Sequence, residues 1–179
     1  MINVLHRNAP LATTRPPRYR WWHALGFGVA ANVVAELLGG GTGFYERQRQ
    51  APFAPPSALF GPAWLLNNAA TLWGNLRLMN LPPGTPGRRA LLGLQGASWA
   101  CFVAFSPAYF RLRSPILGLA CTVGMYGLTL ASLAVAARTD WRIALSLVPL
   151  GLWLTLATPV AAYAAAHNPD ECFGTPAMR

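Results

Sequence analysis

Five apolar stretches alternate along the chain with short polar segments that contain many of its prolines and arginines. Each stretch has about twenty residues, which is long enough for an α-helix to cross the hydrocarbon core of a bilayer. A backbone in lipid must satisfy its own hydrogen bonds, so every stretch is expected to be helical. The predicted spans are residues 21–40, 59–79, 90–110, 115–137 and 141–166.

Hydrophobic residues make up 54% of the chain and charged residues only 11%, a balance typical of a multi-pass membrane protein. The five spans use nearly the whole chain and leave no room for a separate soluble domain. The sequence therefore predicts an all-α fold, an integral membrane bundle of five transmembrane helices over residues 21–168. A basic, loosely ordered N-terminal tail (residues 1–20) precedes the bundle, and a short C-terminal tail (residues 169–179) follows it.

The formal net charge of +9 would suggest a nucleic-acid partner in a soluble protein. Here the arginines lie beside the apolar stretches, which indicates a topology signal and contact with lipid headgroups, so no nucleic-acid partner is expected. The arginines expected on one side of the bilayer are Arg7, Arg15, Arg18, Arg20, Arg77, Arg88, Arg89, Arg138 and Arg142. The other side would carry Arg47, Arg49, Arg111, Arg113 and Arg179. The richer side should face the cytoplasm, which puts the N-terminus inside and the C-terminus outside if the host is a bacterial inner membrane.

The sequence lacks the motifs of common enzyme chemistry. It has no glycine-rich phosphate loop, no His-Glu-x-x-His and no serine nucleophile elbow, so hydrolysis and phosphoryl transfer are not expected and no catalytic residue is assigned. Cys101, Cys121 and Cys172 show no disulfide or metal spacing. His23 and His167 lie at span ends without a second ligand nearby in sequence, so no metal site is predicted.

Asn32 and Glu36 are four residues apart in the first span and share one helical face. A carboxylate in hydrocarbon is costly, so Glu36 would face the bundle interior or be protonated. In the interior it could bind a polar ligand group, pair with an arginine or assist proton movement. Alternatively it lies close to the headgroups and has no special role. Asn68 and Asn75 in the second span are candidate partners for it, or form a helix-helix contact.

The segment over residues 51–64 runs from a proline-rich loop directly into an aromatic helix. Pro55 and Pro56 each fix φ at about −65°, and together they remove two backbone donors, so the approach to the helix is held in one shape. Phe60 and Trp64 follow four residues apart and therefore lie on the same helical face.

This order of motifs resembles the TspO/MBR family, the tryptophan-rich sensory proteins related to the mitochondrial translocator protein. The matching positions are Phe44-Tyr45, Pro55-Pro56, Phe60-Gly61-Pro62, Trp64, Pro149, Trp153, Ala157 and Asn168. The five-span layout agrees with that family. Several positions depart from the family pattern: Phe53 replaces a tryptophan, Asn67-Asn68 replace Leu-Tyr, Leu150 replaces a tyrosine, Ala161 replaces an asparagine, and Trp99 and Phe102 replace Asn and Trp beyond Gln95.

The resemblance implies an aromatic ligand pocket inside the bundle, and an indole ring suits stacking on a planar tetrapyrrole. Trp64 and Trp153 match the family's ligand-lining tryptophans. The expected ligand-binding residues are Phe60, Trp64, Asn68, Trp99, Phe102, Trp153, Ala157 and Glu36. The expected lid is the loop with Tyr45, Phe53, Pro55 and Pro56. Ordinary packing or interfacial anchoring is the alternative for these tryptophans, and the favoured one for Trp21, Trp22 and Trp141.

The leading hypothesis is a membrane receptor or sensor for a hydrophobic planar ligand, a porphyrin or related tetrapyrrole, or else a sterol or another lipid. Light-dependent porphyrin breakdown and a homodimer are implied by the resemblance only. A structural subunit of a larger pigment or electron-transfer complex in the membrane is the alternative. A transporter of a small lipophilic solute is a third.

Overall fold

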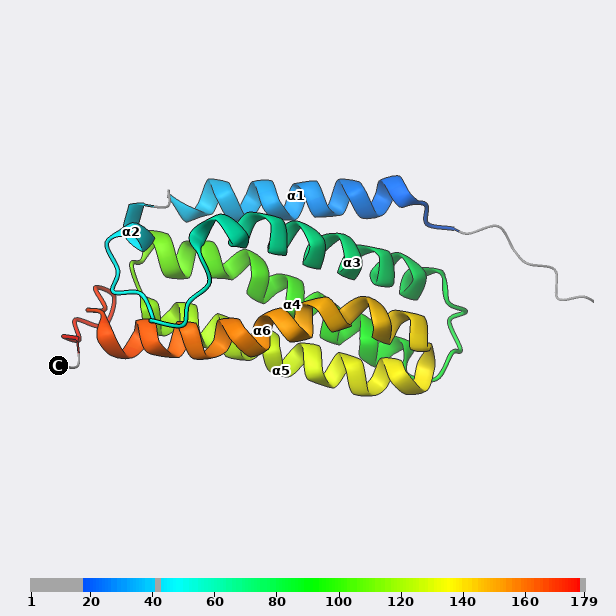
Figure 1. The fold of residues 1–179 in the computed structure, drawn as a ribbon. Helices are drawn as coiled ribbons and strands as arrows, with labels where there is room; N and C mark the ends of the chain where they lie inside the picture. The colour runs from blue at the N-terminus through cyan, green and yellow to red at the C-terminus, as the bar shows by residue number, and fades with distance from the viewer. Residues whose placement is uncertain (1–17, 41–42, 178–179) are drawn as a thin grey trace, which may run out of the picture.

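The chain folds into a bundle of five long helices, each antiparallel to the next, in a computed structural model that describes residues 18–40 and 43–177 (Figure 1). The long helices are α1 (Trp21–Gly39), α3 (Phe60–Asn80), α4 (Arg88–Ser106), α5 (Pro115–Thr139) and α6 (Trp141–His167). The all-α prediction is confirmed, and each helix end lies within a few residues of its predicted position. Three short elements were not predicted: α2 (Gly43–Glu46), a 3-10 turn (Ser57–Leu59) and a π-helical turn (Pro107–Arg111) that prolongs α4.

Four of the helices are long and apolar enough to cross a membrane: α1, α4 with its π turn, α5 and α6. Helix α3 has sufficient length, with 21 residues, but several asparagines and Arg77 make it less apolar. It packs against α6 and α1, and its buried face carries Asn67 and Thr71, so neighbouring helices cover part of its polarity.

The buried face of α1, which packs on α3 and α4, consists of small residues. Its buried positions are Gly28, Ala31, Ala35 and Gly39, three or four residues apart on one face. A Cβ on Gly28 would meet the Leu72 side chain, so this glycine permits the close approach of α1 to α3. Small residues at helix crossings allow the van der Waals contact that drives association in lipid.

The apolar core consists of two clusters at different heights. One contains Leu78, Leu91, Ala136 and Ile143, from α3, α4, α5 and α6. The second lies nearer the loop that carries Pro55 and contains Met125, Leu150 and Leu154, with Trp64 and Phe102 packed against them. The interior of the bundle is therefore divided into layers that four helices share.

Helix starts are fixed by the side chains that the sequence provides there. Asp140 caps α6 by accepting a hydrogen bond from the Arg142 N–H (3.0 Å). It also pairs with Arg77 of α3, and so ties two helices together. Ser114 caps α5 by accepting from the Leu117 N–H (3.0 Å).

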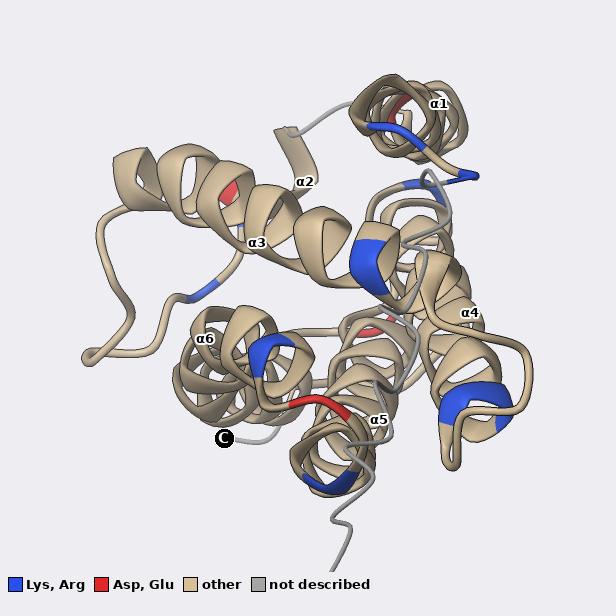
Figure 2. Cartoon of the chain, turned by 90° about the vertical axis from the view of Figure 1, so that its right-hand side faces the viewer, with Lys and Arg blue, Asp and Glu red and all other residues tan. Residues whose placement is uncertain are grey.

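The arginines gather at the two ends of the bundle in the two predicted groups, and Figure 2 looks onto the richer end. Within the described residues that end carries Arg18, Arg20, Arg77, Arg88, Arg89, Arg138 and Arg142 with one acidic residue, Asp140. The opposite end carries Arg47, Arg49, Arg111 and Arg113 together with Glu46, Asp170 and Glu171. Arg7, Arg15 and Arg179 lie outside the described residues. The bundle therefore has one strongly cationic end and one nearly balanced end.

Candidate functional site

Two tryptophans from different helices meet between α3 and α6. The ring centroids of Trp64 and Trp153 are 6.4 Å apart in an edge-to-face arrangement. Phe60 lies edge-on to Trp153 at 5.3 Å, and Phe102 of α4 is tilted against Trp64 at 5.4 Å. We call these four side chains the aromatic cluster. Such geometry is favourable for rings because the positive edge of one faces the negative face of the next.

Further rings extend the aromatic cluster in both directions. Inward, Phe102 contacts Trp99 at 5.3 Å, and Trp99 contacts Phe27 of α1 at 5.1 Å. Toward the loop, Tyr45 lies edge-on to Phe60 at 5.9 Å. The rings thus form a continuous path from the loop at one end of the bundle to the first helix.

The loop between α2 and α3 is fastened to the end of α6 by Asn168. Its side chain accepts from the Arg49 N–H (2.6 Å) and donates to the Arg49 carbonyl (3.1 Å). Asn168 is buried, so these bonds are shielded from water. Phe53 contacts Tyr163 of α6 at 6.3 Å although half of its surface is exposed. The loop is therefore attached to α6 through Asn168, and its proline-rich segment is partly exposed.

The other residues expected in the lid, and Ala157, differ in exposure or position. Pro55 is half-buried and Pro56 is exposed. Tyr45 is half-buried, and burial raises the pKa of its phenol, so the side chain stays neutral in the physiological range. Ala157 of α6 follows Trp153 by four residues and lies on the same helical face.

The rings of the aromatic cluster contact one another between α3 and α6. Two hollows of the described residues lie at the opposite, arginine-rich end, beside Leu76 and Asn80. A planar ligand between the tryptophans would need these rings to separate.

A buried polar layer lies between the two apolar clusters. It contains Asn67 and Thr71 of α3, Gln95 and Ser98 of α4, Thr129 and Ser132 of α5, and Ser146 of α6. Gln95 donates to Ser132 Oγ at 2.9 Å. Within the described residues four buried atoms of this region have no hydrogen-bond partner: Asn67 Nδ2, Thr71 Oγ1, Gln95 Oε1 and Trp99 Nε1. Each such atom costs about 1–3 kcal/mol, so the layer is suited to receive water or a polar group.

One expectation about a polar residue needs correction. Asn32 and Glu36 lie on the exposed face of α1, because the small residues of that helix, and not its polar ones, face the bundle. Glu36 therefore does not line the aromatic cluster. On α3 the buried asparagine is Asn67, whereas Asn68 is half-buried. The spacing of Asn67, Thr71, Gly74 and Leu78 along one helical face could have indicated this.

His23 and His167 lie at opposite ends of the bundle. Within residues 18–40 and 43–177, no group of three or more His, Cys, Asp or Glu side chains could hold a metal ion. His167 stacks on Tyr163 at 3.9 Å, and His23 accepts from the Arg20 N–H. Both histidines therefore have local structural contacts at the two ends of the bundle.

The model of the TspO/MBR family matches residues 24–166, most of the chain and all five long helices. The chain therefore belongs to the TspO/MBR family. No curated protein matches it. Together with its apolar helices, this membership identifies an integral, multi-pass membrane protein of the sensor or receptor type that contacts the lipid bilayer.

Proposed function

We propose that the protein is a membrane receptor for a hydrophobic planar ligand of the porphyrin or tetrapyrrole kind. The ligand binds between α3 and α6, beneath the loop with Tyr45, Phe53, Pro55 and Pro56. The observation that supports this proposal is the convergence of Trp64 and Trp153, from two helices, with Phe60 and Phe102 around them. These rings offer flat apolar faces together with indole N–H donors.

The packing of α3 on α6 changes along their length in a way that favours this site. At the arginine-rich end Gly74 allows the helices to touch, since a Cβ there would collide with Ser146 Oγ. Toward the loop the same helices are separated by Trp64 and Trp153, and they diverge in that direction (Figure 1). Aromatic side chains lie in the wedge-shaped space between the diverging ends of α3 and α6. A flat molecule can enter that space when these side chains change rotamer.

The buried polar layer adds a second requirement on the ligand. Trp99 contacts Phe102 of the aromatic cluster, and its Nε1 has no partner within the described residues. Asn67 Nδ2 lies on the buried face of α3, below Trp64. A ligand with one polar substituent on an apolar ring system would satisfy such donors while its rings stack above them.

Binding of protoporphyrin to the purified protein, followed by porphyrin absorbance, tests the proposal. We expect the Trp64→Ala, Trp153→Ala double variant to bind at least about tenfold more weakly, because each aromatic contact contributes about 0.5–1.5 kcal/mol beyond its buried area. The matched control is Trp21→Ala, Trp141→Ala, which removes two exposed indoles at the other end of the bundle.

Equal affinity of the two double variants would remove the tryptophan pair from the site. A wild-type protein that does not bind protoporphyrin would reject the ligand class. Stoichiometric co-purification with other membrane proteins would instead favour a structural subunit. The same preparation reports whether the protein forms a homodimer.

We also propose that the arginine-rich end faces the cytoplasm of a bacterial cell, with the N-terminus inside. The charge difference between the ends supports this orientation, because cytoplasmic segments of inner-membrane proteins carry the excess of arginine.

A further inference from the structure

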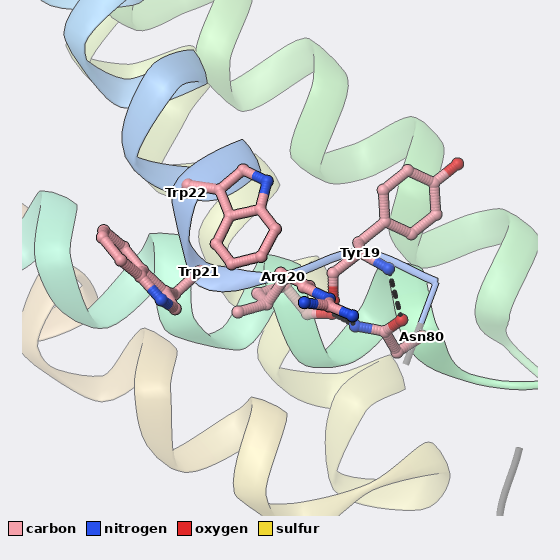
Figure 3. Close-up of a pocket in the computed structure, with 6 residues that line it drawn as sticks. Tyr19, Arg20, Trp21, Trp22 and Asn80 are labelled. Atoms are coloured by element: carbon pink, nitrogen blue, oxygen red, sulfur yellow. Dashed lines mark hydrogen bonds between the residues drawn. The ribbon is translucent and has the colours of Figure 1, made fainter. Parts of the chain in front are cut away.

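A hollow of about 460 Å³ opens at the arginine-rich end between the start of α1 and the end of α3 (Figure 3). It is lined by Tyr19, Arg20, Trp21, Trp22, Leu76 and Asn80. It lies far from the aromatic cluster, at the other end of α3, and the proposed receptor function does not use it.

Hydrogen bonds hold the two sides of this hollow at a fixed separation. Asn80 Oδ1 accepts from the Tyr19 N–H (3.0 Å), the bond drawn in Figure 3, and Asn80 Nδ2 donates to the Tyr19 carbonyl (2.9 Å). The same Nδ2 also donates to the Leu76 carbonyl of its own helix (3.0 Å). The segment before α1 is thus attached to α3, and the hollow is a built feature of the fold.

The walls of the hollow are mostly apolar and remain accessible. Trp21 is 66% exposed and Trp22 is 46% exposed, and their rings meet edge to face. A second hollow of about 300 Å³ shares Leu76 and Asn80 with the first and continues past Trp73. The first hollow has mostly apolar walls, and the second has apolar walls at Trp73, Leu76 and Leu81 beside the polar Arg77 and Asn80. Two adjoining hollows at the level of interfacial tryptophans can each take the first carbons of one acyl chain.

Among the described residues, one cation lines the first hollow. The Arg20 guanidinium lies over the Trp22 ring, 5.0 Å from its centroid, and it takes part in no ion pair within the described residues. Stacking uses the flat face of the guanidinium and leaves its N–H edge available to a phosphate. Arg77, which lines the second hollow, is already neutralised by Asp140.

We propose that this pair of hollows binds one anionic phospholipid, with its phosphate on Arg20 and its acyl chains against Trp21, Trp22 and Trp73. The excess of arginine at this end attracts an anionic headgroup, and the first turn of α1 contains no acidic residue to oppose it. A free phosphate would leave the apolar walls uncovered, so the occupant is a lipid.

Lipid retention by the full-length protein in detergent tests the site. Dioleoylphosphatidylglycerol or dioleoylphosphatidylcholine is added, and bound lipid is counted by native mass spectrometry. We expect the wild-type protein to retain about fivefold more of the anionic lipid, the gain that one basic residue near the surface provides. Arg20→Gln should lose this preference. Arg49→Gln, which removes an arginine at the opposite end, should keep it.

Several results would overturn the proposal. They are equal retention of both lipids by the wild-type protein, an unchanged preference in Arg20→Gln, or an equal loss in Arg49→Gln. Full displacement of the lipid by millimolar inorganic phosphate would identify a simple anion site instead. Trp22→Ala provides a second arm: it should lower retention of both lipids while Arg20 remains. Protoporphyrin binding, measured on the same samples, should not change in Arg20→Gln or in Trp22→Ala.

Discussion

Asp170 is a buried carboxylate in the C-terminal segment, and it fastens that segment to the start of α5. Asp170 Oδ2 accepts from Ser114 Oγ (2.6 Å) and from the Ile116 N–H (3.0 Å), and Oδ1 accepts from the Phe173 N–H (3.0 Å). Burial by itself would raise the pKa of Asp170, but these hydrogen bonds outweigh burial and hold it below its usual value. The ionised form is therefore the one that stabilises the fold.

Replacing this carboxylate should destabilise the protein in a pH-dependent way. We expect Asp170→Asn to lower the free energy of unfolding in detergent by about 1–3 kcal/mol near neutral pH. Because the pKa in the folded state is lowered, the wild-type advantage is complete above about pH 4 and is lost as the pH falls through the folded pKa. Thermal unfolding across a pH series measures this difference.

Glu171 is the matched control for that variant, since its ion pair with Arg113 is about half exposed. An exposed pair contributes little, so Glu171→Gln should change the melting temperature far less. Comparable losses of stability in both variants would show that the change in net charge, and not the loss of the buried hydrogen bonds of Asp170, causes the destabilisation.

Prediction from the sequence was least accurate for the direction in which individual side chains point. Trp64, Phe60 and Trp153 do come together, whereas Glu36 lies on the exposed face of α1 and not beside them. In lipid the exposed face of a helix is as apolar as the buried one, so hydrophobic periodicity does not reveal which side packs. On α1 the small residues, such as Gly28 and Ala35, carry that information.

At the scale of elements, the helices and their turns were predictable because length, prolines and caps are local signals. The short α2 and the π turn after α4 were missed, since each is too short to show a period. The way in which two helices approach one another depends on single small residues, as the contact between Gly74 of α3 and Ser146 of α6 illustrates.

This contact gives a prediction about helix packing. Gly74→Ala places a Cβ against Ser146 Oγ and should destabilise the protein by about 1–3 kcal/mol, because the two helices must separate or the serine must change rotamer. Adding Ser146→Gly provides the missing space and should recover much of the loss. Thermal unfolding of both variants provides the measurement.

Gly96 of α4 offers a control, since a Cβ there would meet nothing within 4 Å. Gly96→Ala should leave the melting temperature equal or slightly higher, as expected for alanine in a helix. If the second substitution gave no recovery to Gly74→Ala, the assigned contact would not be the cause of the loss.

At the scale of the whole molecule, the two ends of the described chain lie at opposite ends of the bundle (Figure 1). An odd number of crossings therefore puts them on opposite sides of the bilayer. A native cysteine can be used to test this topology. Cys172 is exposed in the C-terminal segment, whereas Cys101 and Cys121 lie within α4 and α5 and are half-buried.

If the arginine-rich end faces the cytoplasm, Cys172 should react with a membrane-impermeant maleimide added outside intact cells. As the matched control, Cys172→Ser combined with Thr85→Cys moves the thiol to the loop between α3 and α4 and should require permeabilised cells. The reverse labelling pattern would invert the proposed orientation.

Helix α1 packs on α3 and α4, and both of these partners follow it in the chain. During synthesis, at roughly 5–20 residues per second, α1 leaves the ribosome several seconds before α4 is complete. In that interval it must stay in the bilayer alone, without any neighbour to cover it. The leucines, valines and tryptophans around its circumference meet that need, so the apolar character of α1 serves membrane insertion before it serves the finished bundle.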